Sequence, residues 1–348
     1  MKSSKRELNP VQLANALLPR LRDRTAGRGE LLFPAVPSLA PHYHQVIVEL
    51  FGRLSRPPSR ENSEALRAQL EHRARWGWEQ SPFCRVLLSW ETNEPRGVDC
   101  RIQVEVVTVD EEYSRWRAHA GGDLFGERPD SKVMVTAEML AATSPPRILD
   151  VGAGEGRNTL GLLRAGFAVD AVEPSAELGA RLSERCGREG FACQLFAGRV
   201  EQADLGIPQN HYDLVVLSEV VSTHMRTEAD LRRLLIATRP LLKPTGRLLF
   251  DVFLPLDGYK PHAVVRETAQ CQWCCLFTRG ELERTMLDGG LERIEEVSAL
   301  GWERAHLPPE KWPPTPWFEQ WASGGNVFAL PADKSPIELR WVLARPKS

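Results

Sequence analysis

The 348-residue sequence lacks the features that would place a protein in or on a membrane. No apolar run reaches the roughly 18 residues that a membrane-spanning helix needs, and the basic N-terminus has no apolar core like that of a signal peptide. The net charge is only -2, and no basic stripe with interleaved aromatic residues is present. These absences predict a cytoplasmic protein that has neither a membrane nor a nucleic acid as its partner.

The sequence also lacks the cysteine pattern of a disulfide framework or of a complete metal site. The seven cysteines are an odd number in a chain without an export signal, so we expect reduced thiols. The segment from Cys271 to Cys275 resembles half of a metal-binding knuckle, but no second pair of cysteines or histidines stands at a matching spacing. We therefore predict no metal site and expect these cysteines to pack beside a substrate cavity.

The length is sufficient for two domains of ordinary size. The sequence up to about residue 60 favours helices. Three further elements are then expected: a helix over 61–78, a β-hairpin with strands at 85–90 and 100–107, and a helix over 110–119. We expect residues 1–122 to form an N-terminal α+β accessory domain and residues 123–348 to form the second domain.

The first helix has an apolar stripe from Val11 to Leu21, with Arg20, Arg22 and Arg24 on the opposite side. Such a stripe favours a helix that packs on a domain and keeps its arginines in water. A face that binds an anionic partner is the alternative.

The stretch from Arg147 to Asn158 reads RILDVGAGEGRN and predicts a ligand cradle. Its apolar run, 148–151, is typical of a buried parallel strand. Three glycines alternate with other residues directly after that run, and a helical pattern begins near Asn158. Glycines let the backbone approach a ligand, and the helix N-terminus faces it, so these parts together predict a nucleotide-cofactor site.

The glycine spacing separates this turn from that of dinucleotide-binding proteins. Their fingerprint is G-x-G-x-x-G, whereas Arg157 stands here where the third glycine would fall, and Asp150 lies just before the first glycine. The resulting D-x-G-x-G-x-G pattern resembles motif I of the class I S-adenosylmethionine (SAM) methyltransferases. The resemblance implies SAM as the cofactor, with a carboxylate near the turn to place its amino-acid tail.

A second apolar strand covers 167–172 and ends at Glu173. This carboxylate lies roughly 20 residues beyond the glycine turn, where this architecture places an acid that hydrogen-bonds ribose hydroxyls. We therefore predict that Glu173 holds the ribose of the cofactor.

Strands and helices alternate through the rest of the chain, which predicts βαβ units and a sheet covered by helices on both faces. The expected strands are 147–151, 167–172, 191–196, 212–218, 246–253, 291–297 and 337–344. Residues from about 130 to 346 resemble the class I methyltransferase fold, an α/β, Rossmann-like sandwich with a mostly parallel seven-stranded sheet. The segment LDVGAGEGRNTLGLLRAGFAVDAVEPS looks like the tellurite-resistance-type and small-molecule branches of that superfamily.

The resemblance implies a set of cofactor-binding residues near the carboxyl ends of the strands. The set consists of Asp150, Gly152, Ala153, Gly154, Gly156, Asn158, Glu173, Pro174, Arg199, Val200, Ser218 and Glu219. One position departs from the family, because many relatives place an aspartate on the adenine amino group where this chain has Arg199. Since arginine cannot accept that hydrogen bond, either the backbone of Arg199 and Val200, or the carboxylate of Glu201 or Asp204, should contact adenine.

Candidate catalytic residues follow the fourth strand. Methyl transfer from a sulfonium mainly needs alignment of the reactants and exclusion of water, and a base helps where the nucleophile carries a proton. Glu219 and His224 are the candidates for that base. A surface histidine at a helix entrance explains His224 equally well, and Glu219 could instead bind a cation or a backbone amide.

We expect substrate contacts from five residues: Tyr113, Trp116, Ser222, Asp251 and Phe253. The first two, with Phe125, could roof the cofactor, although ordinary helix packing explains them as well. Ser222 follows the fourth strand, and Asp251 and Phe253 lie at the end of the fifth strand, where these two could equally be core and cap residues. The aromatic and proline-rich stretch 312–321 could be a flap over the substrate or a clamp on the sheet edge.

The fourth strand is followed by Ser218-Glu-Val-Val221, not by the [DN]-P-P-[FYW] motif of amino-methylating DNA enzymes. The leading hypothesis is therefore SAM-dependent methyl transfer to a small metabolite or natural product, with the N-terminal domain closing over the pocket. Two alternatives keep SAM: attack on its aminobutyryl group with release of methylthioadenosine, and SAM binding without catalysis. The chain could also form a homo-oligomer.

Overall fold

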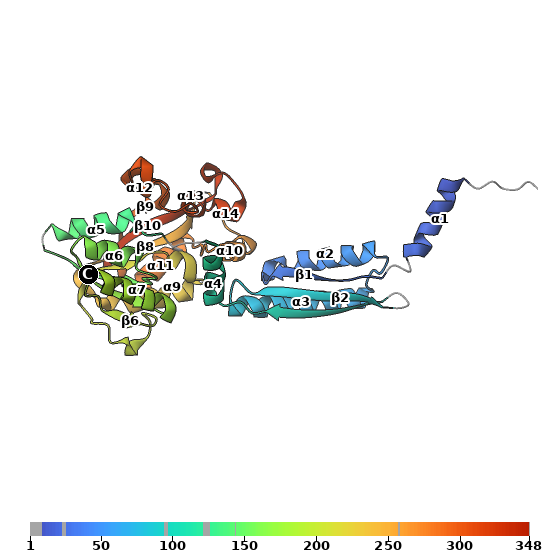
Figure 1. The fold of residues 1–348 in the computed structure, drawn as a ribbon, viewed down its shortest axis with the longest axis horizontal. Coiled ribbons are helices and arrows are strands. Elements are labelled where there is room, and N and C mark those ends of the chain that lie inside the picture. The colour runs from blue at the N-terminus through green and yellow to red at the C-terminus, as the bar shows by residue number, and fades with distance from the viewer. Residues whose placement is uncertain are drawn as a thin grey trace, which may run out of the picture. The chain divides into compact units, whose positions relative to one another are not determined.

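A computed structural model describes residues 9–22, 26–93, 97–120, 126–142, 144–256 and 258–347. The chain divides into two compact units, 1–113 and 114–348 (Figure 1). The division falls inside helix α4 (Val109–Ala120), so the end of this helix belongs to the second unit. The expected boundary at 122/123 and the expected contact of Phe125 lie outside the described residues.

The first unit contains an antiparallel three-stranded sheet with two helices packed on it. The strands are β1 (Arg28–Pro34), β2 (Arg85–Asn93) and β3 (Gly97–Glu105), in the order β1-β2-β3. Helices α2 (Ala40–Arg53) and α3 (Arg60–Gln80) bury Ile47 and Leu70 against Val86 and Leu88 of the sheet. Burial of this shared apolar cluster holds the helices on the sheet.

Strand β1 was not predicted, and the expectation of helices up to residue 60 is wrong there. The segment is a short apolar run, Leu31-Leu-Phe33, and periodicity alone does not distinguish a strand from a helix in so short a run. Pairing decides the outcome, because residues 28–34 form a complete antiparallel register with 85–91 of β2.

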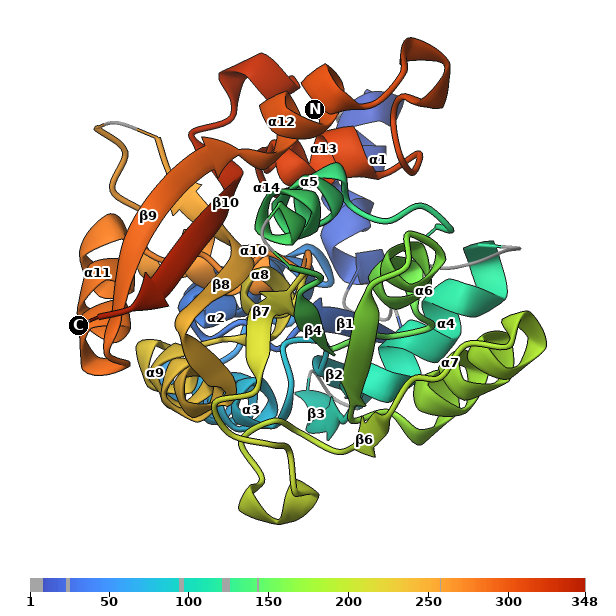
Figure 2. The ribbon, with the colours of Figure 1, turned by 90° about the vertical axis from the view of Figure 1, so that its left-hand side faces the viewer.

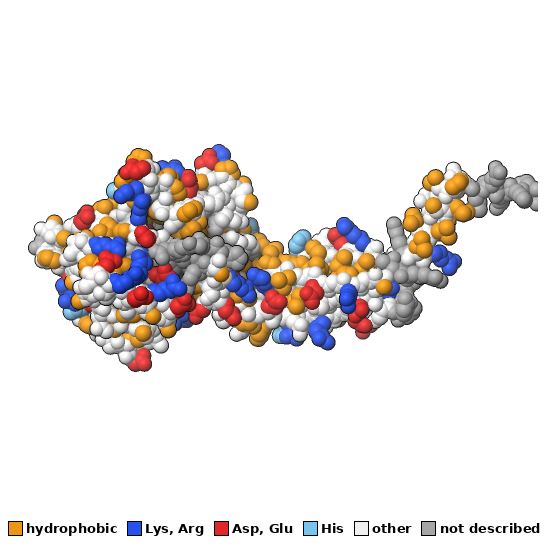
Figure 3. All heavy atoms as spheres, in the orientation of Figure 1, with side chains coloured by type: hydrophobic (Ala, Val, Ile, Leu, Met, Phe, Trp, Pro, Cys, Tyr) orange, Lys and Arg blue, Asp and Glu red, His pale blue; other side chains and the backbone are white. Residues whose placement is uncertain are grey.

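Helix α1 (Pro10–Arg22) belongs to the first unit by sequence. Hydrophobic side chains run along it in Figure 3. Its five large apolar side chains remain 45–66% exposed, namely Val11, Leu13, Leu17, Leu18 and Leu21. The packing of this stripe on a domain, which the sequence favoured, is therefore not seen. Arg24 lies outside the described residues.

The second unit is built on a seven-stranded sheet with the order β6-β5-β4-β7-β8-β10-β9 (Figure 2). Its strands are β4 (Arg147–Val151), β5 (Ala168–Glu173), β6 (Leu195–Ala197), β7 (Tyr212–Leu217), β8 (Leu242–Pro255), β9 (Leu291–Ser298) and β10 (Ile337–Pro346). Strand β10 runs opposite to the other six, pairing antiparallel with β8 and β9, and all other pairs are parallel. The expected α/β, Rossmann-like sheet of seven mostly parallel strands is confirmed.

Two strands begin four residues away from their predicted starts. Strand β6 covers only 195–197 instead of 191–196, and as an edge strand it pairs with β5 alone. Strand β8 begins at Leu242, although the Pro244-Thr-Gly246 sequence was expected to precede it. A register shift in the pairing with β7 lies between the partners of Tyr212 and Leu214, and this irregularity accommodates the extra residues.

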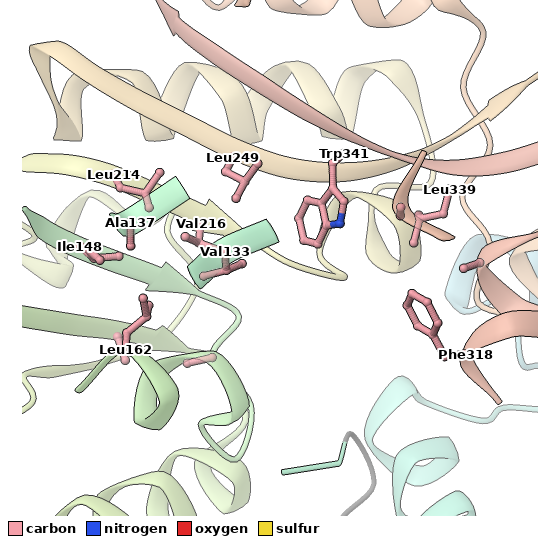
Figure 4. Close-up of a cluster of buried hydrophobic side chains, with 14 of the residues drawn as sticks. Val133, Ala137, Ile148, Leu162, Leu214, Val216, Leu249, Phe318, Leu339 and Trp341 are labelled. Atoms are coloured by element: carbon pink, nitrogen blue, oxygen red, sulfur yellow. The ribbon is translucent and has the colours of Figure 1, made fainter. Parts of the chain in front are cut away.

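Alternating side chains of the sheet enter two separate cores. Leu214 and Val216 of β7 belong to the core shown in Figure 4, and Val215 and Leu217 belong to the other. The first core also contains residues of α5 (Ser131–Ala141), α6 (Arg157–Arg164), α7 (Ala176–Glu189) and α12 (Ala299–His306). The second contains residues of α9 (Glu228–Thr238) and α11 (Arg279–Asp288). Both faces of the sheet are thus covered.

Four short helices occupy the connections that follow β7, β8 and β9. They are α8 (Val221–His224), α10 (Ala263–Gln270), α13 (Phe318–Ala322) and α14 (Gly325–Phe328). The longer helices α9 and α11 begin at capping boxes, formed by Thr227 with Asp230 and by Thr278 with Glu281. None of the described helices combines the length and the apolar character needed to cross a bilayer.

Candidate functional site

The glycine turn joins β4 to α6 through left-handed backbone. The φ angles are +74° at Gly152, +55° at Gly154 and +95° at Gly156. A Cβ added to Gly152 would lie 2.5 Å from Cγ2 of Val220, and one added to Gly156 would lie 2.5 Å from Cδ1 of Leu182. The turn therefore requires glycine for both its conformation and its close packing, as expected for a backbone that approaches a ligand.

The carboxylate of Glu173 meets this turn directly. Its Oε2 accepts a hydrogen bond from Gly154 N at 2.8 Å, and its Oε1 accepts one from Ser175 N at 2.8 Å. These two hydrogen bonds fix the carboxylate beside the turn. A buried carboxylate beside bare glycine backbone fits the ribose of the expected cofactor. Pro174, the next residue, is exposed, whereas Ala153 within the turn is buried.

Asp150 points into the face of the sheet that carries α6. Its Oδ2 accepts a hydrogen bond from Thr159 Oγ1 at 2.6 Å, and the residue is only 2% exposed. Burial raises the pKa of Asp150 to about 6, and the hydrogen bond from Thr159 opposes this rise. The contact fixes the end of β4 to the following helix, and a contact with the cofactor's amino-acid tail stays a prediction.

A buried ionic network that the sequence did not reveal lies next to the turn. Arg157 donates from Nη1 to Asp130 Oδ1 at 2.5 Å and from Nη2 to Glu219 Oε1 at 2.6 Å. Asp130 Oδ2 also accepts from Ser218 Oγ at 2.6 Å and from Asn158 Nδ2 at 3.0 Å. The network joins the start of α5, the start of α6 and the end of β7. It brings together three predicted cofactor residues, Asn158, Ser218 and Glu219.

Asp130 stands at the N-cap of α5, where an aspartate usually accepts from the helix that it precedes. Its carboxylate makes no such bond. Glu303 of α12 takes that role, since Ser131 N and Lys132 N donate to its carboxylate at 3.1 Å and 3.3 Å. Asp130 is thereby left to bind Arg157. The sequence showed that Arg157 replaces a third glycine, which marks the position as unusual. Nothing in the sequence identified Asp130 as the partner of Arg157.

Glu219 adopts φ +59°, which is uncommon for a residue other than glycine. Its backbone N–H donates to Asp251 Oδ2 at 2.9 Å, and Asp251 Oδ1 accepts from Ser222 Oγ at 2.7 Å. Burial raises the pKa of Glu219 to about 7, against the lowering effect of Arg157. Burial also raises the pKa of Asp251 to about 8. Three predicted site residues, Glu219, Ser222 and Asp251, therefore lie together near the carboxyl ends of β7 and β8.

Replacement of Asp251 by asparagine should make the stability of the protein less dependent on pH. The folded-state pKa of about 8 exceeds the ordinary value of 3.8, so the folded protein holds a proton that the unfolded chain releases. This stabilisation is fully present below about pH 4 and is lost as the pH rises through 8. Asparagine can keep both hydrogen bonds without a charge. The melting temperature between pH 5 and pH 9 should thus fall less in Asp251→Asn than in the wild type.

The control for this experiment is Asp288→Asn, which removes a carboxylate that is 46% exposed and paired with Arg232. Its melting temperature should follow the wild-type pH dependence. Parallel wild-type and Asp251→Asn curves would show that Asp251 is not protonated in the folded protein.

The segment after β6, expected to contact adenine, is held by its own contacts. Arg199 N donates to Gln202 Oε1 at 2.6 Å, and Arg199 Nη2 lies 3.5 Å from Glu201 Oε1. Val200 is buried, whereas Asp204 is exposed. An adenine contact through the N–H of Arg199 would require the side chain of Gln202 to turn away, because Gln202 Oε1 already accepts the hydrogen bond from that N–H.

His224 ends helix α8 and lies against Trp273. The two ring centroids are 6.0 Å apart with an interplanar angle of 87°. Burial lowers the pKa of His224 to about 4, and the charge of Arg199 acts in the same direction. His224 is therefore neutral at pH 7, and its low basicity limits it as a proton acceptor.

The other predicted substrate residues fall into different surroundings. Trp116 lies near two tryptophans, with ring centroids 6.0 Å from Trp273 and 5.9 Å from Trp317. Phe253 is fully buried and packs edge-on against Trp321, which matches its alternative role as a core residue. Tyr113 is the last residue of the first unit.

The segment Cys271–Cys275 follows α10 and contributes to the core. Cys274 and Cys275 are at most 1% exposed, and burial raises the pKa of both thiols. All seven cysteines are free thiols. Across the described ranges, no group of three or more His, Cys, Asp and Glu side chains is arranged to hold a metal ion.

Two comparisons bear on the function of the site. Residues 125–296 match the family model of a methyltransferase domain. A demethylmenaquinone methyltransferase from Tropheryma whipplei is 30% identical over 116 residues, which are 33% of this chain and 45% of the relative. The chain thus matches less than half the length of that relative.

Solved structures with a similar fold include a geranyl diphosphate methyltransferase in complex with SAM. It has 14% identity and a TM-score of 0.47, over 69% of this chain and 92% of that one. A SAM-dependent methyltransferase from Clostridium acetobutylicum has 11% identity and a TM-score of 0.46, over 69% and 99% of the two chains. With TM-scores below 0.5, these likenesses add nothing to the fold already described.

Proposed function

Residues 125–296 belong to the class I SAM-dependent methyltransferases, and on this premise we propose that the chain transfers the methyl group of SAM to a small-molecule acceptor. The observation that carries the proposal is the left-handed glycine turn with the Glu173 carboxylate bound to Gly154 N. SAM, the cofactor of this family, supplies an electrophilic methyl group on a cationic sulfonium. The task of the protein is to orient the donor and the acceptor and to exclude water.

The charges around the turn support a cationic donor. The buried carboxylate of Asp130 and the partly buried carboxylate of Glu219 share the single guanidinium of Arg157. An ammonium or a sulfonium would give these two carboxylates a second positive partner, and opposite charges attract strongly where water is excluded. Asp150 adds a further carboxylate beneath the turn.

The identity of the base remains part of the proposal. A base is most effective when its pKa lies near the working pH, which favours Glu219, with a pKa of about 7, over His224, with a pKa of about 4. One carboxylate oxygen of Glu219 is bound to Arg157, however, so Glu219 can take a proton only from a methyl acceptor that reaches its other oxygen. His224 remains a hydrogen-bond partner for the acceptor.

A small-molecule acceptor agrees with the name of the curated relative, a demethylmenaquinone methyltransferase. The net charge of -2 offers no general attraction for nucleic acid. The tellurite-resistance branch, the cytoplasmic location, the absence of a nucleic-acid partner and the homo-oligomer stay predictions of the sequence.

Incubation with SAM and a panel of hydroxyl-, amino- and thiol-bearing metabolites should yield S-adenosylhomocysteine and an equal amount of one methylated product. Mass spectrometry of the mixture measures both. Gly152→Val is the inactive control, because the turn has φ +74° there and a Cβ would lie 2.5 Å from Val220. Release of methylthioadenosine would instead indicate attack on the aminobutyryl group, and SAM binding without any product would indicate a non-catalytic protein.

A further inference from the structure

Four rings within residues 114–348 form one aromatic surface, defined here as Trp116, His224, Trp273 and Trp317. Trp273 lies at its centre, with its ring centroid 6.0 Å from those of both Trp116 and His224. Trp317 joins through Trp116 at 5.9 Å. Each of the four residues is partly exposed. Three indoles that are grouped and still accessible to solvent offer a large apolar face for a ligand.

Trp273 is held in an unfavourable backbone conformation. Its φ is +58°, an outlier for a bulky side chain. The surrounding contacts fix it, because Trp321 Nε1 donates to the carbonyl of Trp273 at 3.1 Å and Cys274 N donates to Ala269 O at 2.9 Å. Strain of this kind persists where the structure over-determines it and is concentrated at ligand sites. Packing alone would not require an indole at a position that suits glycine.

The loop that carries Trp273 is fixed to the reactive edge of the sheet. Cys275 N donates to Ser222 O of α8 at 2.6 Å, and Phe277 N donates to Phe253 O near the end of β8 at 3.1 Å. Helix α8 begins two residues after Glu219. In open α/β sheets, ligands bind outside the carboxyl ends of the strands, so the aromatic surface lies on the side where the acceptor must meet the donor.

The charged groups around the aromatic surface disfavour a cation on it. The charge of Arg199 acts on His224. Arg226, in the turn after α8, donates to Gln270 Oε1 at 3.0 Å at the base of the Trp273 loop. The nearby carboxylates of Glu219 and Asp251 are already bound by Arg157, Ser222 and backbone N–H. A tryptophan face alone attracts cations, but these two guanidinium groups oppose that attraction, with Arg199 also lying 3.5 Å from Glu201.

We propose that the aromatic surface binds the methyl acceptor and that this acceptor presents a flat aromatic or conjugated ring without positive charge. The proposal rests on the proposed methyl transfer and adds the chemical class of the substrate. Ring stacking on indoles favours flat π systems over saturated rings of the same size. The faces of Trp116, Trp273 and Trp317 are the recognition elements, and His224 is a neutral hydrogen-bond partner at the edge.

The test uses the full chain saturated with S-adenosylhomocysteine and follows ligand binding by ligand-observed NMR. The probes are 2-naphthol, its saturated analogue decahydro-2-naphthol, and choline. We expect 2-naphthol to bind at least tenfold more tightly than either of the others. In Trp273→Gly the affinity for 2-naphthol should fall at least tenfold while the melting temperature does not fall, because glycine suits φ +58°. Trp116→Ala provides a second variant with the same expected loss of binding.

Trp76→Ala is the matched control, because Trp76 is a 40% exposed indole in the first unit. It should bind 2-naphthol like the wild type. Equal binding of decahydro-2-naphthol, preferred binding of choline, or unchanged binding in Trp273→Gly would overturn the proposal. Calorimetry with S-adenosylhomocysteine distinguishes a failure of the proposed function from a failure of the aromatic-acceptor proposal. Failure of the wild type to bind it refutes the proposed function, whereas normal binding without selectivity for 2-naphthol refutes only the aromatic acceptor.

Discussion

Exchange of Glu173 for alanine should weaken the binding of SAM and S-adenosylhomocysteine by about 10²–10⁴-fold. The carboxylate is only 6% exposed, and each of its oxygens already accepts one backbone hydrogen bond. We expect it to accept hydrogen bonds from the two ribose hydroxyls as well. Hydrogen bonds to a charged group contribute about 1.5–3 kcal/mol each, and the loss of two of them gives this range. Calorimetric titration with S-adenosylhomocysteine measures the change.

The same exchange leaves Gly154 N and Ser175 N without their acceptor, so the melting temperature has to be followed together with the affinity. Glu173→Gln keeps one acceptor oxygen, so its melting temperature and its affinity for S-adenosylhomocysteine should both fall less than in Glu173→Ala. Glu177→Ala is the control, because this residue of α7 is 56% exposed and pairs with Arg181. A folded Glu173→Ala protein that binds S-adenosylhomocysteine normally would remove Glu173 from the cofactor site.

The limits of the two central strands β4 and β7 could be predicted closely from the sequence. The limits of β4 and β7 agree with their predictions to within one residue, since a strand buried on both faces is a continuous apolar run. Strand β1, which was missed, and strand β6, which was misplaced, lie at sheet edges, whereas β8, which begins four residues before its predicted start, is interior. An edge strand pairs on one side only, so its limits depend on the neighbouring strand and are only weakly marked in its own sequence.

In the candidate site, features set by neighbouring residues in the sequence could be predicted, whereas contacts between distant residues could not. The glycine turn could be predicted because left-handed backbone restricts its own residues, and Glu173 because strand ends recur at regular intervals. The partners of Arg157 could not, since Asp130 and Glu219 lie 27 and 62 residues away along the chain. The loop of Trp273 likewise contacts Trp321, 48 residues further on. Such contacts arise only once the sheet has assembled.

Exchange of Arg157 for methionine should destabilise the protein by about 3–5 kcal/mol at pH 8. The guanidinium, 13% exposed, is the counter-ion of two carboxylates that are 8% and 17% exposed. Its removal leaves Asp130 and Glu219 buried without that positive charge. Glu219 already has a pKa of about 7, and loss of the lowering effect of Arg157 raises it further. The deficit should therefore be smaller at pH 5.5, where Glu219 is protonated, and should grow as the pH rises.

Urea unfolding of the variant and the wild type at pH 5.5 and pH 8 measures this difference. Arg164→Met is the matched control, because that arginine is 47% exposed and its pair with Glu189 lies at the surface, where ion pairs contribute little. Adding Glu219→Gln to Arg157→Met should recover part of the loss at pH 8, since the double variant no longer buries that carboxylate charge. If Arg157→Met cost no more than the control and showed no dependence on pH, the network would not be a source of stability. The negative charges of the carboxylates beside the glycine turn would then have to be balanced by groups other than Arg157.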